Sequence, residues 1–377
     1  MMTNNKRLIL ASGILCLALS ACTTTSTDKG SAAETYKAMN KLTVKENWFT
    51  QSLPEQNIDS PATWHGPDGQ HWLFATAKAA DCVNIYDAFS AEPIASIGTS
   101  GSELGQMLRP NGIWTVDNLL LVAERDNKRV QVFTLPDLKP VLAFGQSELQ
   151  KPYGLCVIKK GPERYDVYVT DNYETPDEEQ VPPEQMDRRV RMYKLTLSGD
   201  VANAELAATF GDTSGAGILY TVESIIADTA RGRLLIADED METTGAHNTK
   251  IYSLEGKFSG ITLADGMYRN QAEGLAMLYA DPKESRWQEA GIAGRTYYFL
   301  TDQGEKENYY HIYDADSLSY LGSVELEGTL NTDGVWLDPS ESDIFPLGAF
   351  YAVDDDCRVA AADIRKFLDI LRVKASQ

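Results

Sequence analysis

The sequence has few of the residues on which zinc enzymes, redox enzymes and disulfide-rich proteins depend. Its 377 residues include four histidines and five cysteines, with no CxxC and no HExxH motif. Cys16 and Cys22 lie in the first 22 residues, so Cys82, Cys156 and Cys357 can form at most one internal disulfide. A zinc site of the usual kind is therefore not expected. A glycine-rich phosphate loop and a Ser-His-Asp order are also absent from the sequence.

Positive charge is scarce as well. The chain has 34 lysines and arginines against 55 aspartates and glutamates, which gives a formal net charge of −21 at pH 7 and a pI of about 4.6. Such a chain repels nucleic acid and anionic membrane surfaces, so neither is expected as a partner. It attracts cations, and an anionic substrate would need a positive group between itself and the protein.

The longest apolar run, residues 8–19, is too short to span a bilayer comfortably. It follows Lys6 and Arg7 and precedes Leu-Ser-Ala-Cys at residues 19–22, an order typical of a secretion signal. These four residues resemble a bacterial lipobox, which implies cleavage before Cys22 and lipidation of its thiol. The alternative is an ordinary signal peptide that is cut near Ala21.

The segment that follows Cys22 is rich in serine and threonine and is typical of a flexible tether. Thr23, rather than aspartate, follows the cysteine, which in lipoproteins implies the outer membrane. We therefore expect a signal peptide at residues 1–21, a lipidated cysteine and tether at 22–45, and the folded domain at 46–377. The protein would face the periplasm or the cell surface as a monomer, and only its lipid anchor would touch the membrane.

A strand–hairpin–strand pattern at residues 108–135 repeats along the chain. It begins with a Pro-Asn-Gly turn signal, continues with an apolar run and a charged loop, and ends with an alternating run. Similar openings start near residues 60, 109, 152, 221, 270 and 331, a spacing of about 40–50 residues with two longer intervals. Repeats of this length predict an all-β fold, a six-bladed β-propeller.

Four segments lie outside these repeats. Residues 34–54 are expected to supply an outer strand that closes the ring. Residues 172–189, acidic and proline-rich, and residues 281–294, polar, account for the two longer intervals and are predicted to be surface loops. Helical periodicity is strong only at residues 364–373, which predicts a short terminal helix.

Acidic residues recur in the predicted loops at the strand ends on one face of the ring. Oxygen ligands gathered in this way suit Ca²⁺ better than Zn²⁺. A solvated acidic loop is the alternative for any single residue. Three acids, Glu223, Glu273 and Asp333, take the same place in their repeats, before an apolar run, where packing alone would not favour an acid. The candidates are Asp59, Glu124, Asp171, Glu223, Asp238, Glu239, Asp240, Glu273, Asp302, Asp333, Asp354 and Asp355.

Basic residues near the openings are candidates for binding phosphate, namely Lys78, Arg109, Arg125, Lys128 and Arg129. Arg109 and Arg125 are the better candidates because a guanidinium group matches two phosphate oxygens at once. Lys128 and Arg129 follow a hairpin tip and are more typical of a solvated turn. A Pro-Tyr-Gly turn holds Tyr153, which is as consistent with packing as with ligand contact. The core and the blade edges are expected to contain Trp64, Trp72, Trp114 and Trp336.

The order of these openings resembles the β-propeller phytases, calcium-dependent phosphatases that act on inositol hexakisphosphate. The similarity covers roughly residues 55–360, and its specificity comes from the order, one piece per blade, rather than from any single piece. The matching pieces are Ser60-Pro61-Ala62-Thr63-Trp64, Arg109-Pro110-Asn111, Pro152-Tyr153-Gly154-Leu155-Cys156, Val222-Glu223 with Asp228, Ala272-Glu273-Gly274-Leu275, Asp302-Gln303-Gly304 with Tyr313-Asp314, Asn331-Thr332-Asp333-Gly334 and Phe345-Pro346-Leu347-Gly348.

The resemblance implies a six-bladed ring with several Ca²⁺ ions in an acidic central channel. The ions would bridge the protein to substrate phosphates, and a water activated by the metal would attack phosphorus. Carried over by position, the calcium or water-activating carboxylates would be Glu223, Glu239, Glu273 and Asp333. The phosphate contacts would be Lys78, Arg125 and Tyr153.

With the loop acids included, the expected metal ligands are Asp59, Glu223, Asp238, Glu239, Glu273, Asp302 and Asp333. The expected catalytic residues are Glu223, Glu273 and Asp333, and the expected substrate contacts are Lys78, Arg109, Arg125 and Tyr153. The expected function is Ca²⁺-dependent hydrolysis of a phosphomonoester in a phytate-like small molecule.

Several positions depart from the family pattern. Gln271 stands where an acid is preferred before the glutamate of the fifth opening, and Ser224 replaces the glycine that follows the glutamate of the fourth. A basic residue is expected after Val169-Thr170, but Asp171, Asn172 and the acidic insertion follow there. The loss of one carboxylate and one cation is expected to weaken the calcium site and lower turnover.

Two other functions fit a propeller of this kind. The second repeat is also similar to an NHL repeat, which favours a non-catalytic propeller that binds a protein or an envelope ligand; such a module needs an exposed apolar or aromatic patch. A propeller lactonase would instead need one Ca²⁺ ringed by Glu, Asn and Asp.

Overall fold

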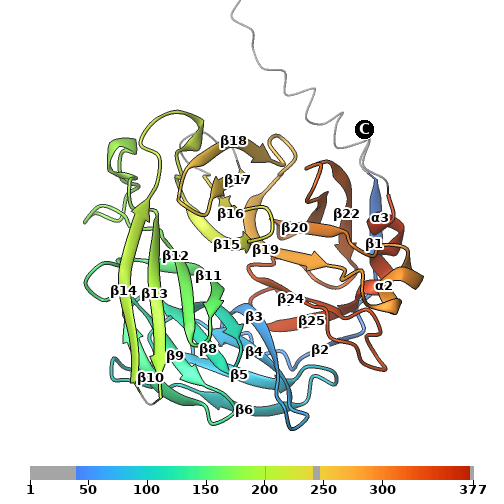
Figure 1. Ribbon diagram of the computed structural model, residues 1–377, viewed down its shortest axis with the longest axis horizontal. Helices are drawn as coiled ribbons and strands as arrows, with labels where there is room; N and C mark the ends of the chain where they lie inside the picture. The colour runs from blue at the N-terminus through green and yellow to red at the C-terminus, as the bar shows by residue number, and fades with distance from the viewer. Residues whose placement is uncertain (1–39, 200, 241–246, 374–377) are drawn as a thin grey trace, which may run out of the picture.

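Six small sheets surround a central axis in the computed structural model, which describes residues 40–199, 201–240 and 247–373 (Figure 1). Consecutive strands of each sheet pair in antiparallel register, so each sheet is a meander that starts beside the axis and ends at the rim. This arrangement is a six-bladed β-propeller, and the predicted fold is confirmed.

The first three blades contain four strands each. Blade 1 consists of β3 (Ile58–His65), β4 (His71–Ala77), β5 (Cys82–Asp87) and β6 (Pro93–Ile97). Blade 2 consists of β7 (Pro110–Val116), β8 (Leu119–Glu124), β9 (Arg129–Thr134) and β10 (Lys139–Phe144). Blade 3 consists of β11 (Pro152–Gly161), β12 (Arg164–Asp171), β13 (Val190–Ser198) and β14 (Val201–Phe210).

The last two blades receive strands from the N-terminal part of the chain. Blade 4 consists of β15 (Val222–Asp228), β16 (Arg233–Asp238), β17 (Asn248–Ser253) and β18 (Phe258–Leu263). Blade 5 consists of β19 (Gln271–Tyr279), β20 (Thr296–Gln303), β21 (Tyr309–Asp314), β22 (Tyr320–Leu326) and β1 (Lys41–Val44). Blade 6 consists of β23 (Val335–Asp338), β24 (Ala349–Asp354), β25 (Arg358–Asp363) and β2 (Trp48–Phe49).

The ring is closed by the N-terminal strands. β2 pairs antiparallel with β25 and completes blade 6, while β1 pairs parallel with β22 at the edge of blade 5. The expected closing strand is thus present in the described part of residues 34–54. Since β1 lies before residue 46, the propeller begins earlier than the boundary that the sequence suggested.

An apolar cluster fills the interface between each pair of neighbouring blades. Blades 1 and 2 meet through Phe74 and Leu120, for example, and blades 5 and 6 meet through Phe299 and Phe350, whose rings stack at 5.6 Å. Successive strand residues point to opposite faces of a sheet, so an apolar strand feeds both neighbouring interfaces. The six clusters link every blade to the next and hold the axis in place.

Short helices lie at the rim. Residues 281–294, predicted to be only a polar loop, contain α2 (Ser285–Ala290), so that prediction was wrong for this helix. Its Trp287 is fully buried in the cluster between blades 5 and 6, which explains a helix of only six residues. The predicted terminal helix corresponds to η3 (Ile364–Phe367) and α3 (Leu368–Leu371). Two further 3₁₀ turns are η1 (Pro183–Gln185) and η2 (Gly215–Gly217).

None of the helices in the described residues is long and apolar enough to cross a membrane. The predicted signal peptide and the predicted lipidation site at Cys22 lie outside the described residues. The three cysteines of the propeller, Cys82, Cys156 and Cys357, are free thiols.

Candidate functional site

One side chain from the start of each blade surrounds one end of the axis. Five inner strands have a register shift near their start, between one paired residue and the third residue after it, as at Val222/Ile225 in β15 and Ala272/Leu275 in β19. The residue that directly follows the last paired residue before this shift is therefore equivalent from blade to blade. In blade order, these residues together with Asp333 form what we call the axial ring: Asp59, Asn111, Tyr153, Glu223, Glu273 and Asp333.

A small residue follows each member of the axial ring because the blades approach closely there. A Cβ on Gly154 would lie 2.7 Å from the backbone oxygen of Glu223, and one on Gly334 would lie 2.5 Å from that of Asp59. The hydroxyl of Thr170 in blade 3 donates to the same Glu223 oxygen at 2.8 Å. The backbone that carries the axial ring is thus fixed by contacts between neighbouring blades.

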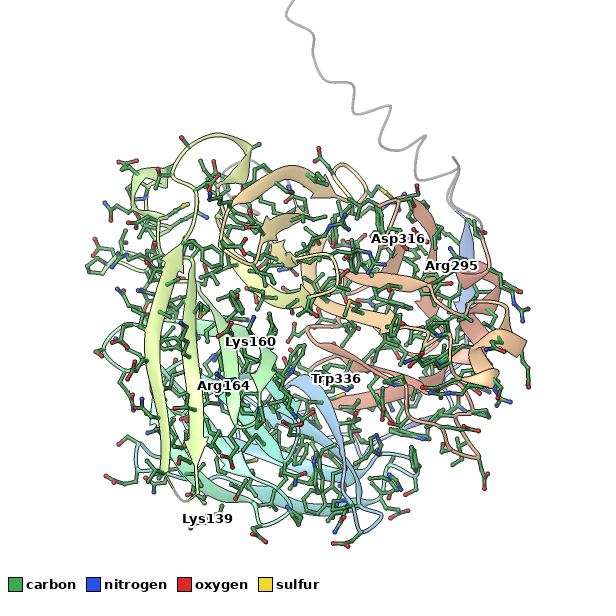
Figure 2. All side chains as sticks on the ribbon, in the orientation of Figure 1. Lys139, Lys160, Arg164, Arg295, Asp316 and Trp336 are labelled. Carbon is green, nitrogen blue, oxygen red and sulfur yellow. The ribbon has the colours of Figure 1, made fainter. Side chains whose placement is uncertain are left out.

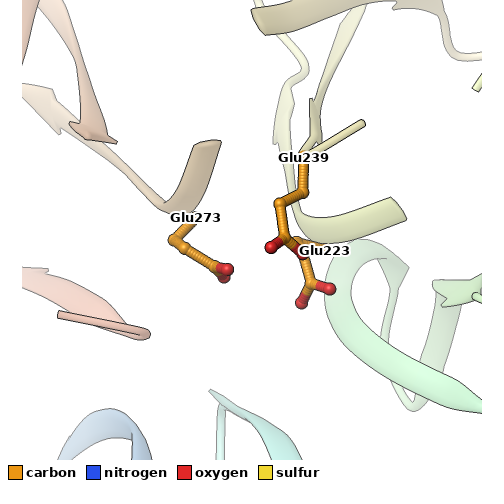
Figure 3. A group of neighbouring side chains, drawn as sticks. All are labelled: Glu223, Glu239 and Glu273. Atoms are coloured by element: carbon orange, nitrogen blue, oxygen red, sulfur yellow. The ribbon is translucent and has the colours of Figure 1, made fainter. Parts of the chain in front are cut away.

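Three glutamates gather on one side of this ring. Glu223 and Glu273 belong to the ring, and Glu239 directly follows β16. Each offers a carboxylate oxygen, and these atoms lie within 4.8 Å of one another. Figure 3 shows Glu273 reaching across from β19 toward Glu223 and Glu239. We call these three residues the glutamate cluster.

The glutamate cluster is electrostatically costly without a cation. Glu223 is 4% exposed and Glu273 is 8% exposed. Burial, and then the charges of neighbouring carboxylates, raise the pKa of both carboxyl groups well above the usual range. Neither side chain has a hydrogen-bond or ion-pair partner among the described residues. Their oxygens are therefore open to a ligand.

On the other side of the ring, Lys78 balances the negative charge of two aspartates. Its ammonium lies 2.8 Å from Asp59 Oδ1 and 3.0 Å from Asp333 Oδ2. Burial opposes the charge, but Asp59 and Asp333 outweigh it and raise the pKa of Lys78. Burial also raises the pKa of Asp333 to about 8, against the opposing effect of Lys78. The ring therefore contains a fixed ammonium group next to a carboxyl group that titrates near neutral pH.

The remaining ring members are neutral hydrogen-bonding groups. The charge of Glu223, together with burial, raises the pKa of the Tyr153 phenol well above 10, so it stays protonated. Asn111 is fully buried, and neither polar atom of its amide has a partner among the described residues. Because buried amides are almost always hydrogen-bonded, this amide is available to a ligand or a water.

Below the ring, the axis is apolar. Trp114 and Trp336 pack edge to face at 5.0 Å, and Trp336 lies near the centre of the molecule in Figure 2. Both line a cavity of about 150 Å³ with Ile226, Leu275 and Met277. The tryptophans thus pack around the axis, and the polar chemistry is confined to the other end.

Two predicted metal ligands lie away from the glutamate cluster. Asp238 accepts N–H groups of Tyr220 and Thr221 and pairs with Lys250. Asp302 accepts the N–H groups of Arg269 and Asn270 and lies 3.4 Å from His311. These contacts give both aspartates a role in holding a loop to its blade.

The same arrangement recurs in five blades. A buried acid at the end of the second strand accepts N–H groups from the loop before the first strand and pairs with a base on the third strand. We call these five acids the loop clamps, and they are Glu124, Asp171, Asp238, Asp302 and Asp354. Ala77 stands at the equivalent position in blade 1. Their regular spacing reflects the repeat rather than a shared ligand.

The predicted phosphate-binding residues separate into two places. Lys78 and Tyr153 reach the axial ring. Arg125 lies outside it, paired with Asp126, and lines an open cleft of about 760 Å³ with Lys128 and Lys151. Arg109 is in neither place: its backbone N–H bonds to Asp81, and its Nε is buried without a partner in the described structure.

The insertion at residues 172–189 forms a wall beside the site. It has its own small apolar cluster, which includes Tyr173 and Met186, and the buried Arg189 donates to the backbone oxygens of Tyr173 and Leu219. A cavity of about 250 Å³ lies between this wall and Glu239. The insertion is thus an ordered surface loop that borders the glutamate cluster.

Sequence reasoning did not assign a role to three polar residues of the site. Asn111 shares the repeat position of Glu223 and Glu273, which the aligned openings could have revealed. Gln271 donates to Glu239, and Gln303 donates to Asp333, so both amides contact carboxylates of the site. Only the spatial pairing of strands shows these two contacts.

No family model matches the chain, and no curated protein matches its sequence. Among solved structures, hydrazine synthase of Kuenenia stuttgartiensis is similar at 13% identity, over 86% of this chain and 81% of that chain, with a TM-score of 0.47. The nidogen/laminin complex is similar at 12% identity, over 73% and 82% of the chains, with a TM-score of 0.43. These similarities concern the β-propeller fold alone.

Proposed function

We propose that this protein is a Ca²⁺-dependent phosphomonoesterase of the phytase type, which works at the axial ring. The observation that carries the proposal is the glutamate cluster, whose three carboxylates, two of them buried, come within 4.8 Å of one another and have oxygens open to a ligand. Carboxylate oxygens are the ligands that Ca²⁺ prefers. The Asn111 amide, which has no partner among the described residues, is a further group available to a ligand. The resemblance of the repeat openings to β-propeller phytases supports a phosphate ester as substrate.

The donor set fits a Ca²⁺ ion held by Glu223, Glu239 and Glu273. Such an ion would supply Lewis-acid stabilisation of the charge on a phosphoryl group and would orient that group. The protein supplies the remaining functions. The Lys78 ammonium and the Tyr153 phenol are donors for phosphoryl oxygens, and the Asn111 amide adds a neutral donor on the same side of the ring.

Asp333 is the group that would accept a proton from attacking water, on a lone pair that Gln303 and Lys78 leave unused. Its pKa of about 8 keeps it in exchange with protons near neutral pH, where a general base is most effective. Outside the ring, Arg125, Lys128 and Lys151 line an open cleft, but Asp126, Glu174 and Glu178 line it too and balance their charge. The attraction of an anion to this acidic protein would therefore depend on a bound cation and on Lys78.

The binding-module alternative has less support. Large exposed apolar side chains in the described residues are spread over several blades, as with Ile94 of β6, Val201 of β14 and Ile261 of β18. A lactonase centre would need asparagine among its ligands, and Asn111 is the asparagine of the axial ring. Both remain outcomes of the test below. As a lipoprotein of the cell envelope, the protein would meet its substrate outside the cytoplasm.

The test is phosphate release from phytate by the purified protein with Ca²⁺ or with EGTA. We expect release with Ca²⁺ and its loss with EGTA or in Glu273→Gln. The control is Glu205→Gln, which removes an equal charge from the exposed outer strand β14 and should keep full activity. Failure to release phosphate from phytate or simpler phosphomonoesters would refute the proposal. Calcium-dependent hydrolysis of a lactone instead would establish the lactonase.

A further inference from the structure

Two glutamines of blade 5 bind different carboxylates of the site and separate these carboxylates into two groups. Gln271 at the start of β19 lies directly opposite Gln303 at the end of β20. Gln271 Nε2 donates to Glu239 Oε1, and Gln303 Nε2 donates to Asp333 Oδ1. One amide thus binds Glu239 in the glutamate cluster, and the other binds Asp333 beside Lys78.

The part of the ring around Lys78 has no free carboxylate oxygen. Asp333 uses Oδ1 for Gln303 and Oδ2 for Lys78. Asp59 uses Oδ1 for Lys78 and Oδ2 for the hydroxyl of Ser60 at 2.8 Å. A cation at these oxygens would have to compete with the buried ammonium, which is held by two ion pairs.

The glutamate cluster differs from this arrangement. Glu223 and Glu273 have no donor among the described residues, and Glu239 accepts only from Gln271 and from no charged group there. A free space of about 20 Å³ lies inside the ring, bordered by Tyr153, Glu223 and Glu273 and also by Asp59 and Asp333. A volume of about 10–15 Å³ is the least that a single water needs, so this space accommodates about one particle of that size.

We propose that this site binds one divalent cation, in the glutamate cluster, and that Lys78 permanently occupies the place of a second cation between Asp59 and Asp333. The inference rests on the proposed function and makes it more specific. A phosphoryl group would then be held between one Ca²⁺ ion and one ammonium group. The resemblance to phytases, by contrast, implies several Ca²⁺ ions.

The test is the stoichiometry of Ca²⁺ binding to the full chain, measured by isothermal titration calorimetry with calcium alone. We expect one equivalent, with Glu273→Gln weakening its binding by at least the roughly tenfold that is typical when even an outer partner of a metal ligand is lost. Asp59→Asn removes a partner of Lys78 and should keep one equivalent with a smaller loss of affinity, because Asp59 acts on the glutamates only through its charge. If Asp59→Asn weakens calcium as much as Glu273→Gln does, the division of the ring is refuted.

A second variant asks whether Lys78 replaces a cation. In Lys78→Met, the freed oxygens of Asp59 and Asp333 should bind a second equivalent of calcium. The matched control is Lys159→Met, which breaks an exposed ion pair with Asp117 and should keep one equivalent. If the Lys78→Met variant does not fold, the stoichiometry of the wild type still tests whether the site binds one cation. Two or more equivalents in the wild type would overturn this inference and leave the proposed function standing, whereas no binding would overturn both.

Discussion

Asp238 and Glu239 are neighbours in the sequence, yet the structure predicts opposite effects when each loses its charge. Asp238 is a fully buried loop clamp whose carboxylate accepts two backbone N–H groups and pairs with the buried Lys250. Glu239 points into the glutamate cluster. We therefore expect Asp238→Asn to reduce stability and to leave calcium affinity nearly unchanged. We expect Glu239→Gln to weaken calcium binding without a loss of stability.

The size of the stability effect follows from burial. Removal of one partner from a buried ion pair costs about 3–5 kcal/mol because the other charge is left uncompensated. An unfolding entropy of about 2.1 cal/mol/K per residue over about 330 residues gives about 0.7 kcal/mol/K. Asp238→Asn should thus lower the Tm by about 4–7 °C. In Glu239→Gln the loss of a repulsive charge should leave the calcium-free Tm unchanged or slightly higher.

The assay is thermal unfolding followed by circular dichroism, with and without Ca²⁺, on the wild type and both variants. The calcium-induced rise in Tm should persist in Asp238→Asn and should shrink or vanish in Glu239→Gln. If Asp238→Asn abolished the calcium response at an unchanged calcium-free Tm, Asp238 would be a metal ligand, as the sequence suggested, and the loop-clamp assignment would be wrong.

Two further predictions concern pH and the rim. The Asp333 carboxyl has a folded-state pKa of about 8 against an ordinary 3.8, so its contribution to stability is present below pH 3.8 and is lost as the pH rises toward 8. Burial raises the pKa of Glu223 and Glu273, and Ca²⁺ needs both carboxylates ionised, so the calcium-induced rise in Tm should grow as the pH rises above the ordinary glutamate pKa of 4.5. A rise in Tm that is the same at every pH would contradict the glutamate cluster as the calcium site. Trp287→Ala should cost about 3–5 kcal/mol through the cavity it leaves at α2, without a change in calcium affinity. A loss of calcium binding in that variant would mean that the rim and the axial ring are coupled.

Much of the fold could be predicted because each blade repeats one local pattern. The alternation of apolar and polar residues and the turn signals are properties of short segments, so they indicate the strands without knowledge of their partners. The helix α2 could not be predicted in this way. It has only six residues, and the burial of Trp287 between two blades depends on contacts far apart in the sequence.

The candidate site could be predicted only in part, for a related reason. Glu223, Glu273 and Asp333 share a repeat position, so alignment of the openings identified them together. Asp238 and Glu239 could not be told apart, because successive residues at a strand end point to opposite sides. Which side faces the axis becomes known only when the register of β15 and β16 is known.

The most direct test of the account is the position of calcium in a crystal grown with Ca²⁺, located by its anomalous signal. The account predicts one strong peak bounded by the carboxylates of Glu223, Glu239 and Glu273, with the Lys78 ammonium still between Asp59 and Asp333. A structure with no calcium at the glutamate cluster, or with calcium in place of the Lys78 ammonium, would contradict it.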